Sequence, residues 1–148
     1  MAIVGRGEIQ RVIERLAAFD PSVIRWRLVD DGPAERLVVE PKSEALCGFS
    51  MEIEAKGGRD YGFYFGHGAS LDSLNPTEYD PLHLVEAVAA GMVDEKLWRL
   101  GRSFIARTHA TLQLYDGRKL FDDSAMLPWL WRLARPTKTT YSAYPSRG

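Results

Sequence analysis

Hydrophobic and polar residues recur along the chain with two different periods, and the first of these predicts a helix near the N-terminus. Between Glu8 and Ala18, apolar residues return every three or four positions, which places them on one stripe of a helix. The stripe consists of Ile9, Val12, Ile13 and Leu16. Asp20-Pro21 follows, and proline disfavours helical geometry in the residue before it. We therefore expect the helix to end before Asp20.

Four strands are predicted in the next part of the chain. Apolar and polar residues alternate over Val23–Val29 and over Gly48–Ala55, which is the period of a half-buried strand. Arg36–Glu40 is a short β-branched run, and Tyr61–Phe65 is an aromatic one. Lys56-Gly57-Gly58-Arg59 separates the last two strands, and paired glycines supply the positive φ angles of tight turns. We therefore predict a β-hairpin there.

A loop and a second helix come next. Residues Gly66–Tyr79 include glycines, serines and an Asn-Pro pair, which are typical of a loop. Asp80 is a suitable N-cap, and Pro81 occupies the first helical position, where its missing N–H costs nothing. The apolar stripe that follows comprises Leu82, Val85, Val88, Ala89 and Met92.

Two further strands and a short helix complete the pattern. Alternation returns over Lys96–Gly101 and Ser103–Tyr115, and a short helix is expected from Asp122 to Leu133. The order is α-β-β-β-β-α-β-β-α. Because strands follow strands without intervening helices, we predict an α+β fold. Its core is a mainly antiparallel sheet of about six strands, with the helices packed on one face.

The composition sets the class of protein. A chain of 148 residues with 45% hydrophobic residues can bury a core without a disulfide, and the single Cys47 can form no internal one. We expect residues 1–135 to form one domain and residues 136–148 a polar, basic tail. The net charge of −1 argues against nucleic-acid binding, which needs a basic excess.

The expected compartment is the cytoplasm. The N-terminus lacks the basic and apolar segments of a signal peptide, and no apolar stretch is long enough to span a membrane, so we expect a soluble protein. Arginine outnumbers lysine by 14 to 5, as in proteins from GC-rich genomes, and we expect a bacterial source.

The aromatic strand offers the first candidate site. Period-two geometry puts Tyr64 on the face opposite Phe63 and Phe65, beside the bare backbones of Gly62 and Gly66. A planar ligand could lie in such a groove, since glycine in a strand often marks close approach by another group. Alternatively, Tyr64 simply covers its glycine neighbours. The segment resembles an RNA-recognition signature only in part, because Asp60 stands where glycine belongs, so we reject that function.

The three histidines predict no metal site, because none has a ligand at metal-binding spacing. Phosphate-binding loops and nucleophile motifs are also absent, and no cofactor is expected. His67 lies in the glycine-rich loop after the aromatic strand. With Tyr64 and Asp72 it could line a small-molecule pocket between the sheet and the second helix, since binding residues favour loops on rigid scaffolds.

Two further groups of residues could contact a partner. Arg25 and Arg27 share one face of a strand, where they either pair with carboxylates across the sheet or hold an external anion. Near the C-terminus, tryptophan and arginine, which are common at interface hot spots, gather as Trp129, Trp131 and Arg132. The alternative is a docked terminal helix whose tryptophans seal the core.

These observations favour a non-enzymatic binding or accessory protein that acts through protein–protein contacts, as an immunity or regulatory factor does. The alternative is a small-molecule site around Tyr64 and His67, with or without catalytic activity. A third hypothesis is self-association through an edge strand or the tryptophan segment.

Overall fold

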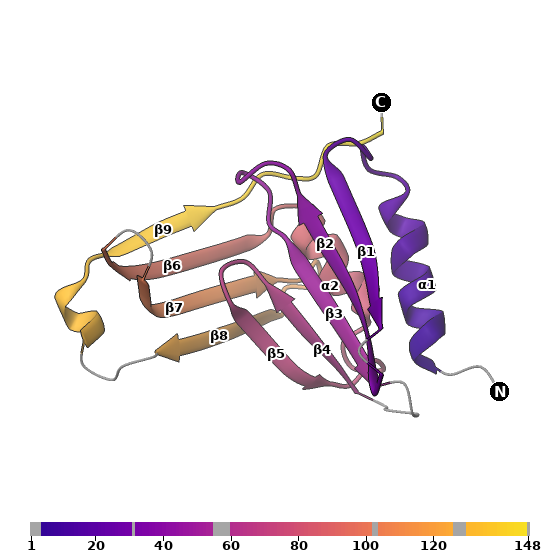
Figure 1. The fold of residues 1–148 in the computed structure, drawn as a ribbon, viewed down its shortest axis with the longest axis horizontal. Coiled ribbons are helices and arrows are strands. Elements are labelled where there is room, and N and C mark those ends of the chain that lie inside the picture. The colour runs from indigo at the N-terminus through magenta and orange to yellow at the C-terminus, as the bar shows by residue number, and fades with distance from the viewer. Residues whose placement is uncertain (1–3, 31, 55–59, 102–103, 126–129, 148) are drawn as a thin grey trace.

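The computed structural model describes residues 4–30, 32–54, 60–101, 104–125 and 130–147 (Figure 1). Within them the chain forms two α-helices, one 3-10 helix and two antiparallel sheets. The elements are α1 (Val4–Leu16), β1 (Ile24–Asp30), β2 (Ala34–Pro41), β3 (Phe49–Glu54), β4 (Tyr61–Phe65), β5 (Ala69–Leu74), α2 (Pro81–Ala89), β6 (Val93–Leu100), β7 (Phe104–Gln113), β8 (Lys119–Ala125), η1 (Leu130–Leu133) and β9 (Pro136–Thr140).

The first sheet is a five-stranded meander in the order β1-β2-β3-β4-β5. Its registers put apolar residues opposite one another, for example Leu37 opposite Met51 and Phe49 opposite Phe65. These side chains all leave the same face, because side chains alternate along a strand. The two helices cover this face (Figure 1) and contact each other. Phe63, at the centre of the face, is fully buried.

The second sheet has the order β8-β7-β6-β9 and lies beside the β5 edge of the first (Figure 1). The backbone N–H of Ser70 on β5 donates to Asp122 Oδ2 on β8 at 3.1 Å. Ala110 and Leu112 of β7 belong to the same buried cluster as Phe63. The two sheets therefore share one continuous core where they meet. We call this contact between the β4–β5 side of the first sheet and the second sheet the seam.

The C-terminal segment ties the sheets and helices together. β9 pairs with β6, and the chain then runs between the β2–β3 loop and the end of α2. The backbone N–H of Ser142 donates to the Ala45 carbonyl at 2.8 Å, and the backbone N–H of Tyr144 donates to the Ala89 carbonyl at 2.7 Å. Tyr144 is buried against Phe19, at a ring-centroid distance of 5.3 Å. The segment predicted as a polar tail thus supplies a strand and a core residue.

The two α-helices lie where they were predicted, but the buried face of α2 includes Leu84 and Ala87, whereas Met92 of the predicted stripe lies outside the helix and is exposed. The buried stripe of α1 is Ile9, Val12 and Leu16. Asp80 caps α2 by accepting a hydrogen bond from the Leu82 backbone at 3.0 Å. Among the residues that the structure describes, neither helix is long and apolar enough to cross a membrane.

The fold class is α+β with antiparallel sheets, as predicted, but the single sheet of about six strands is wrong. Three unpredicted strands account for the difference. In β5 the alternation is broken at Ser73, whose φ of 56° marks a bulge, so the pattern reads as a loop. In β8 the apolar Phe121 faces outward and the polar Asp122 inward. Because this reverses the usual alternation, the strand was not recognised, and Asp122 was predicted to begin a helix. In β9 only Thr139 is partly buried.

Replacing Tyr144 by alanine tests whether the C-terminal segment is part of the core. We expect Tyr144→Ala to lower the free energy of unfolding by about 3–5 kcal/mol, as for other buried aromatic residues, in urea titrations followed by circular dichroism. Tyr115 is 77% exposed, so Tyr115→Ala is the control and should cost less than about 1 kcal/mol. Equal stability of the two variants would mean that the segment does not contribute to the core.

Candidate functional site

The structure separates the residues of the predicted pocket. Tyr64 and Asp72 meet on the uncovered face of the first sheet, where the Tyr64 hydroxyl donates to Asp72 Oδ1 at 3.4 Å. The Tyr64 ring lies over Gly62, since a Cβ added there would come within 2.8 Å of the hydroxyl. Tyr64 therefore covers its glycine neighbour, and two small hollows lie beside its ring. One of about 220 Å³ lies towards Gly66 and Gly68, and one of about 170 Å³ is lined by Gly62, Tyr64 and Asp72.

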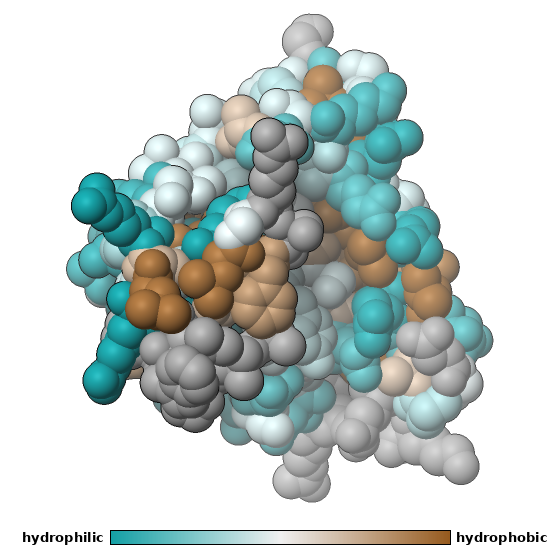
Figure 2. Space-filling view, turned by 60° about the vertical axis from the view of Figure 1, so that its left-hand side comes forward, coloured by the Kyte–Doolittle hydropathy of each residue, from teal (hydrophilic) through white to brown (hydrophobic). Residues whose placement is uncertain are grey.

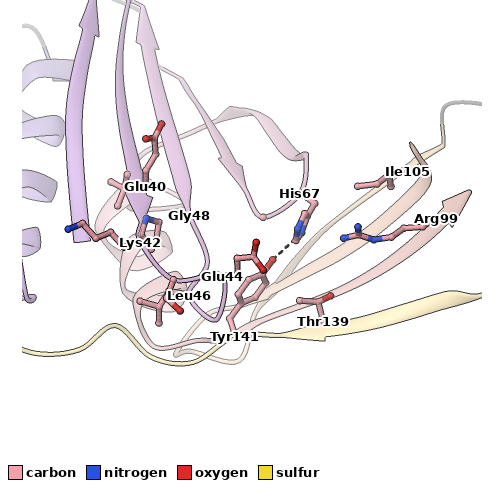
Figure 3. Close-up of a pocket in the computed structure, with 14 residues that line it drawn as sticks. Glu40, Lys42, Glu44, Leu46, Gly48, His67, Arg99, Ile105, Thr139 and Tyr141 are labelled. Carbon is pink, nitrogen blue, oxygen red and sulfur yellow. Dashed lines mark hydrogen bonds between the residues drawn. The ribbon is translucent and has the colours of Figure 1, made fainter. Parts of the chain in front are cut away.

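His67 instead lines a larger cleft of about 700 Å³, to which Tyr64 and Asp72 do not contribute. This cleft lies between the β2–β3 end of the first sheet and the second sheet (Figure 3). The predicted location between the sheet and the second helix was wrong. A hollow beside α2 does exist, but it is lined by other residues, among them Leu82, Met92 and Tyr115.

A buried carboxylate lies next to His67. Glu95 of β6 is only 1% exposed, and it accepts hydrogen bonds from two residues. Its Oε2 accepts from the His67 backbone N–H at 2.9 Å, and its Oε1 lies 3.2 Å from His67 Nδ1. The Tyr141 hydroxyl also donates to Oε1 and lies 3.2 Å from the same ring nitrogen. Charge-assisted bonds of this kind offset the cost of burying a carboxylate.

Gly66 makes room for this carboxylate. Its φ is +64°, a left-handed conformation that L side chains rarely adopt. A Cβ at this position would lie 2.4 Å from Glu95 Oε1. Glycine is therefore required at position 66 for two reasons: the turn needs a positive φ, and Glu95 needs the space to reach the His67 backbone.

The neighbouring phenol and thiol stay protonated. Burial, and then the hydrogen bond to Glu95, raise the pKa of Tyr141 above its ordinary value, so Tyr141 acts as a neutral hydrogen-bond donor. Burial, and then the charge of Glu95, raise the pKa of the Cys47 thiol to about 12. Because the thiolate is the nucleophilic form, Cys47 is suited to packing rather than to covalent chemistry.

These contacts fix the orientation of His67. When Nδ1 carries a proton, it donates to Glu95, so the carboxylate holds one tautomer and one ring orientation. The His67 side chain is 41% exposed, and within the described residues its Nε2 has no hydrogen-bond partner. The arrangement presents one imidazole nitrogen to the cleft, where it can accept a proton or, once protonated, donate a hydrogen bond.

Glu95 and Tyr141 were missed by sequence reasoning. The signal for Glu95 was its position between Val93 and Leu97, which places a carboxylate on the apolar side of a strand. Placing the start of that strand at Lys96 hid this signal. Tyr141 lay in the segment predicted as a tail, and only the three-dimensional structure brings it to β6.

The predicted arginine pair lies elsewhere, on the edge strand β1. Arg27 pairs with Glu40 of the neighbouring β2 at 3.2 Å, and Arg25 is exposed opposite the same residue. Glu52 is bound by Arg36 at 2.7 Å. Of the two alternatives, pairing across the sheet is therefore confirmed for Arg27, with Glu40 of β2 as its partner.

The C-terminal candidates lie at the far end of the second sheet. Trp129 is outside the described residues. Trp131 belongs to η1, but its side chain is outside the description, and Arg132 is exposed. Figure 2 brings this end forward and shows apolar side chains gathered on it. Phe104 of β7 and Leu133 of η1 are among the exposed apolar residues of these elements.

Substituting Gly66 tests the carboxylate network. We expect Gly66→Ala to destabilise the fold by about 3–5 kcal/mol, the range for breaking a buried charged pair, because the new methyl group displaces Glu95. Gly117 also has a positive φ, +90°, but open space around it. Gly117→Ala should therefore cost only the backbone strain, about 1–2 kcal/mol. Chemical denaturation measures both, and equal losses would contradict a steric requirement at Gly66.

The site thus combines an oriented histidine, a buried carboxylate and a neutral phenol at one end of an open cleft. Within the described residues, no group of three or more His, Cys, Asp or Glu side chains is placed to hold a metal ion. Comparison of the chain with protein families, curated proteins and solved structures finds no match.

Proposed function

We propose that this chain is a small-molecule-binding protein whose ligand occupies the cleft between the two sheets. The observation that carries the proposal is the buried Glu95 network, whose partners His67 and Tyr141 line that cleft. An apolar residue of similar volume at position 95 would often serve stability as well or better. A carboxylate that orients a half-exposed histidine is better explained by a task for that histidine.

The walls of the cleft support binding of a ligand with both polar and apolar parts. Among the apolar residues, Leu46 lines the side of the first sheet and Ile105 lines the side of the second. Polar groups converge from His67 and Tyr141. A concave site that combines apolar side chains with convergent polar groups is typical of ligand binding. The proposal is for binding without a covalent step, and it assigns no reaction to His67.

Filling the cleft should abolish binding. Thr139 of β9 lines the cleft, whereas Thr140 is the next residue on the same strand and faces away. We expect metabolites found in a thermal-shift screen to stabilise the wild type and Thr140→Trp but not Thr139→Trp. Binding of a ligand to the native state alone raises the melting temperature.

Two outcomes would contradict the proposal. Ligands that stabilise both tryptophan variants equally would bind outside the cleft. A broad metabolite panel that stabilises none of the three proteins would remove the support for a small-molecule function.

A second candidate function is protein–protein contact through β1, for which the exposed edge of the first sheet is the specific observation. Ile24 lies opposite Pro41, which has no N–H, so this pair cannot exchange the two bonds of a hydrogen-bonded pair. Trp26 and Leu28 lie two and four residues after Ile24, so they also occupy non-hydrogen-bonded pairs. Their backbone N–H and C=O groups therefore point away from β2. Their side chains are 43% and 53% exposed. Such an edge can accept a strand from another chain.

Trp26→Lys tests this second candidate. We expect the wild type to associate, with itself or with a protein captured from its own cells, and the variant to lose that association in size-exclusion and pull-down experiments. Leu133→Lys is the control, because it changes an exposed apolar residue at the opposite end of the molecule. A wild type that is strictly monomeric and captures nothing would eliminate this candidate.

A further inference from the structure

We propose that the cleft selects a small organic carboxylate, with its anionic head group held by Arg99 and His67 and its apolar body against the cleft walls. This inference rests on the proposed small-molecule function and names the ligand class of the same site. It is carried by a cationic side chain that the fold directs into the cleft.

A β-bulge in β7 lies opposite Arg99 and shapes this part of the cleft. Trp98 of β6 lies opposite Arg107 of β7, but Arg99 lies opposite Ile105, so Ala106 is the extra residue. Bulges re-aim side chains and are common beside functional sites. Here the bulge brings Ile105 to the same face as Arg99, and both line the cleft. Figure 3 shows the Arg99 guanidinium directed inward, on the side where His67 lies.

The charge of Arg99 is available to a ligand. Within the described residues the structure gives this side chain no hydrogen bond and no ion pair, whereas most other arginines near carboxylates are paired, such as Arg27 with Glu40. A planar guanidinium offers two parallel donors that match the two oxygens of a carboxylate. Arg99 is therefore suited to anchor such a group.

His67 supplies the second contact. Its Nδ1 is occupied by Glu95 and Tyr141, so Nε2 is the nitrogen left for a ligand. When the ring is protonated, Nε2–H donates to an anion while the Glu95 carboxylate balances the charge of the ring from behind. An anionic head group between Arg99 and His67 would thus have opposite charge or a donor on two sides.

The other charged side chains that line the cleft are two carboxylates and one cation, namely Glu40, Glu44 and Lys42, and this balance disfavours a ligand with several negative charges. Glu44 lines the same cleft (Figure 3), and like charges at short range disfavour each other. A phosphate-rich ligand would place further negative charge near Glu44. An aliphatic or aromatic body would instead contact Leu46 and Ile105, where burial of apolar area is favourable.

The test is a titration of isotope-labelled protein, followed by amide shifts in NMR spectra, with hexanoate as the probe. Hexanamide, hexylammonium and inorganic phosphate are the comparison probes, since they remove the charge, reverse it or remove the apolar body. We expect hexanoate to shift amides that line the cleft and to bind at least about tenfold more tightly than the other three, where tenfold corresponds to about 1.4 kcal/mol.

Substitutions on β6 identify the anchor. Arg99→Gln should weaken hexanoate binding about tenfold or more, and Arg99→Lys should restore only part of the affinity, because it keeps the charge but loses the two parallel donors. Lys96→Gln is the matched control, since Lys96 is an exposed cation on the opposite face of the same strand. Its affinity should equal that of the wild type.

The outcomes separate this inference from the binding function itself. If hexanamide or hexylammonium binds in the cleft as tightly as hexanoate, the cleft remains a ligand site but the carboxylate class is wrong. Tighter binding of phosphate than of hexanoate would also overturn the carboxylate class. Equal hexanoate affinities of the wild type and Arg99→Gln would do the same. If no probe shifts cleft amides while screen ligands distinguish Thr139→Trp from Thr140→Trp, only the ligand class fails.

Discussion

The structure around the seam depends on the burial of one carboxylate. Glu95 is almost fully removed from water, and an unpaired charge there would cost several kcal/mol. Its donors come from the turn after β4 and from the segment after β9. The fold can therefore bury Glu95 only by bringing these segments to β6 together, and Gly66 is the residue that allows the turn to approach.

This requirement joins the architecture to the site. His67 belongs to the first sheet, Glu95 to the second, and Tyr141 to the segment that threads past α2. A Cβ on Gly91, just after that helix, would lie 2.7 Å from the Tyr141 carbonyl oxygen, so the threading is close on this side as well. The hydrogen bonds of Glu95 to His67 link the second sheet to the first, and they also orient the His67 imidazole in the cleft. A change that loosens the seam should therefore disturb binding and stability together.

Local patterns in the sequence were enough for the helices and for the strands with clean alternation. The N-cap at Asp80 and the alternation along β7 were both predicted, because capping and period-two burial are encoded within a few residues. The division into two sheets was not, because it depends on which distant strands pair. The site was predicted only at His67: Tyr141 lies 46 positions from Glu95, and no local pattern records that contact.

Two charged side chains, Glu95 and Arg99, lie on the inner face of β6. Glu95 is hydrogen-bonded, whereas Arg99 has no partner within the described residues. Glu95 and Arg99 leave the same face four residues apart, about 13 Å along a strand, too far to neutralise each other directly. Glu95 is satisfied by His67 and Tyr141 inside the seam. Arg99 lies at the bulge and lines the cleft, and within the described residues no carboxylate pairs with it. The same strand thus supplies one charge to the core and the other to the open cleft, where we propose that the carboxylate of a ligand pairs with Arg99.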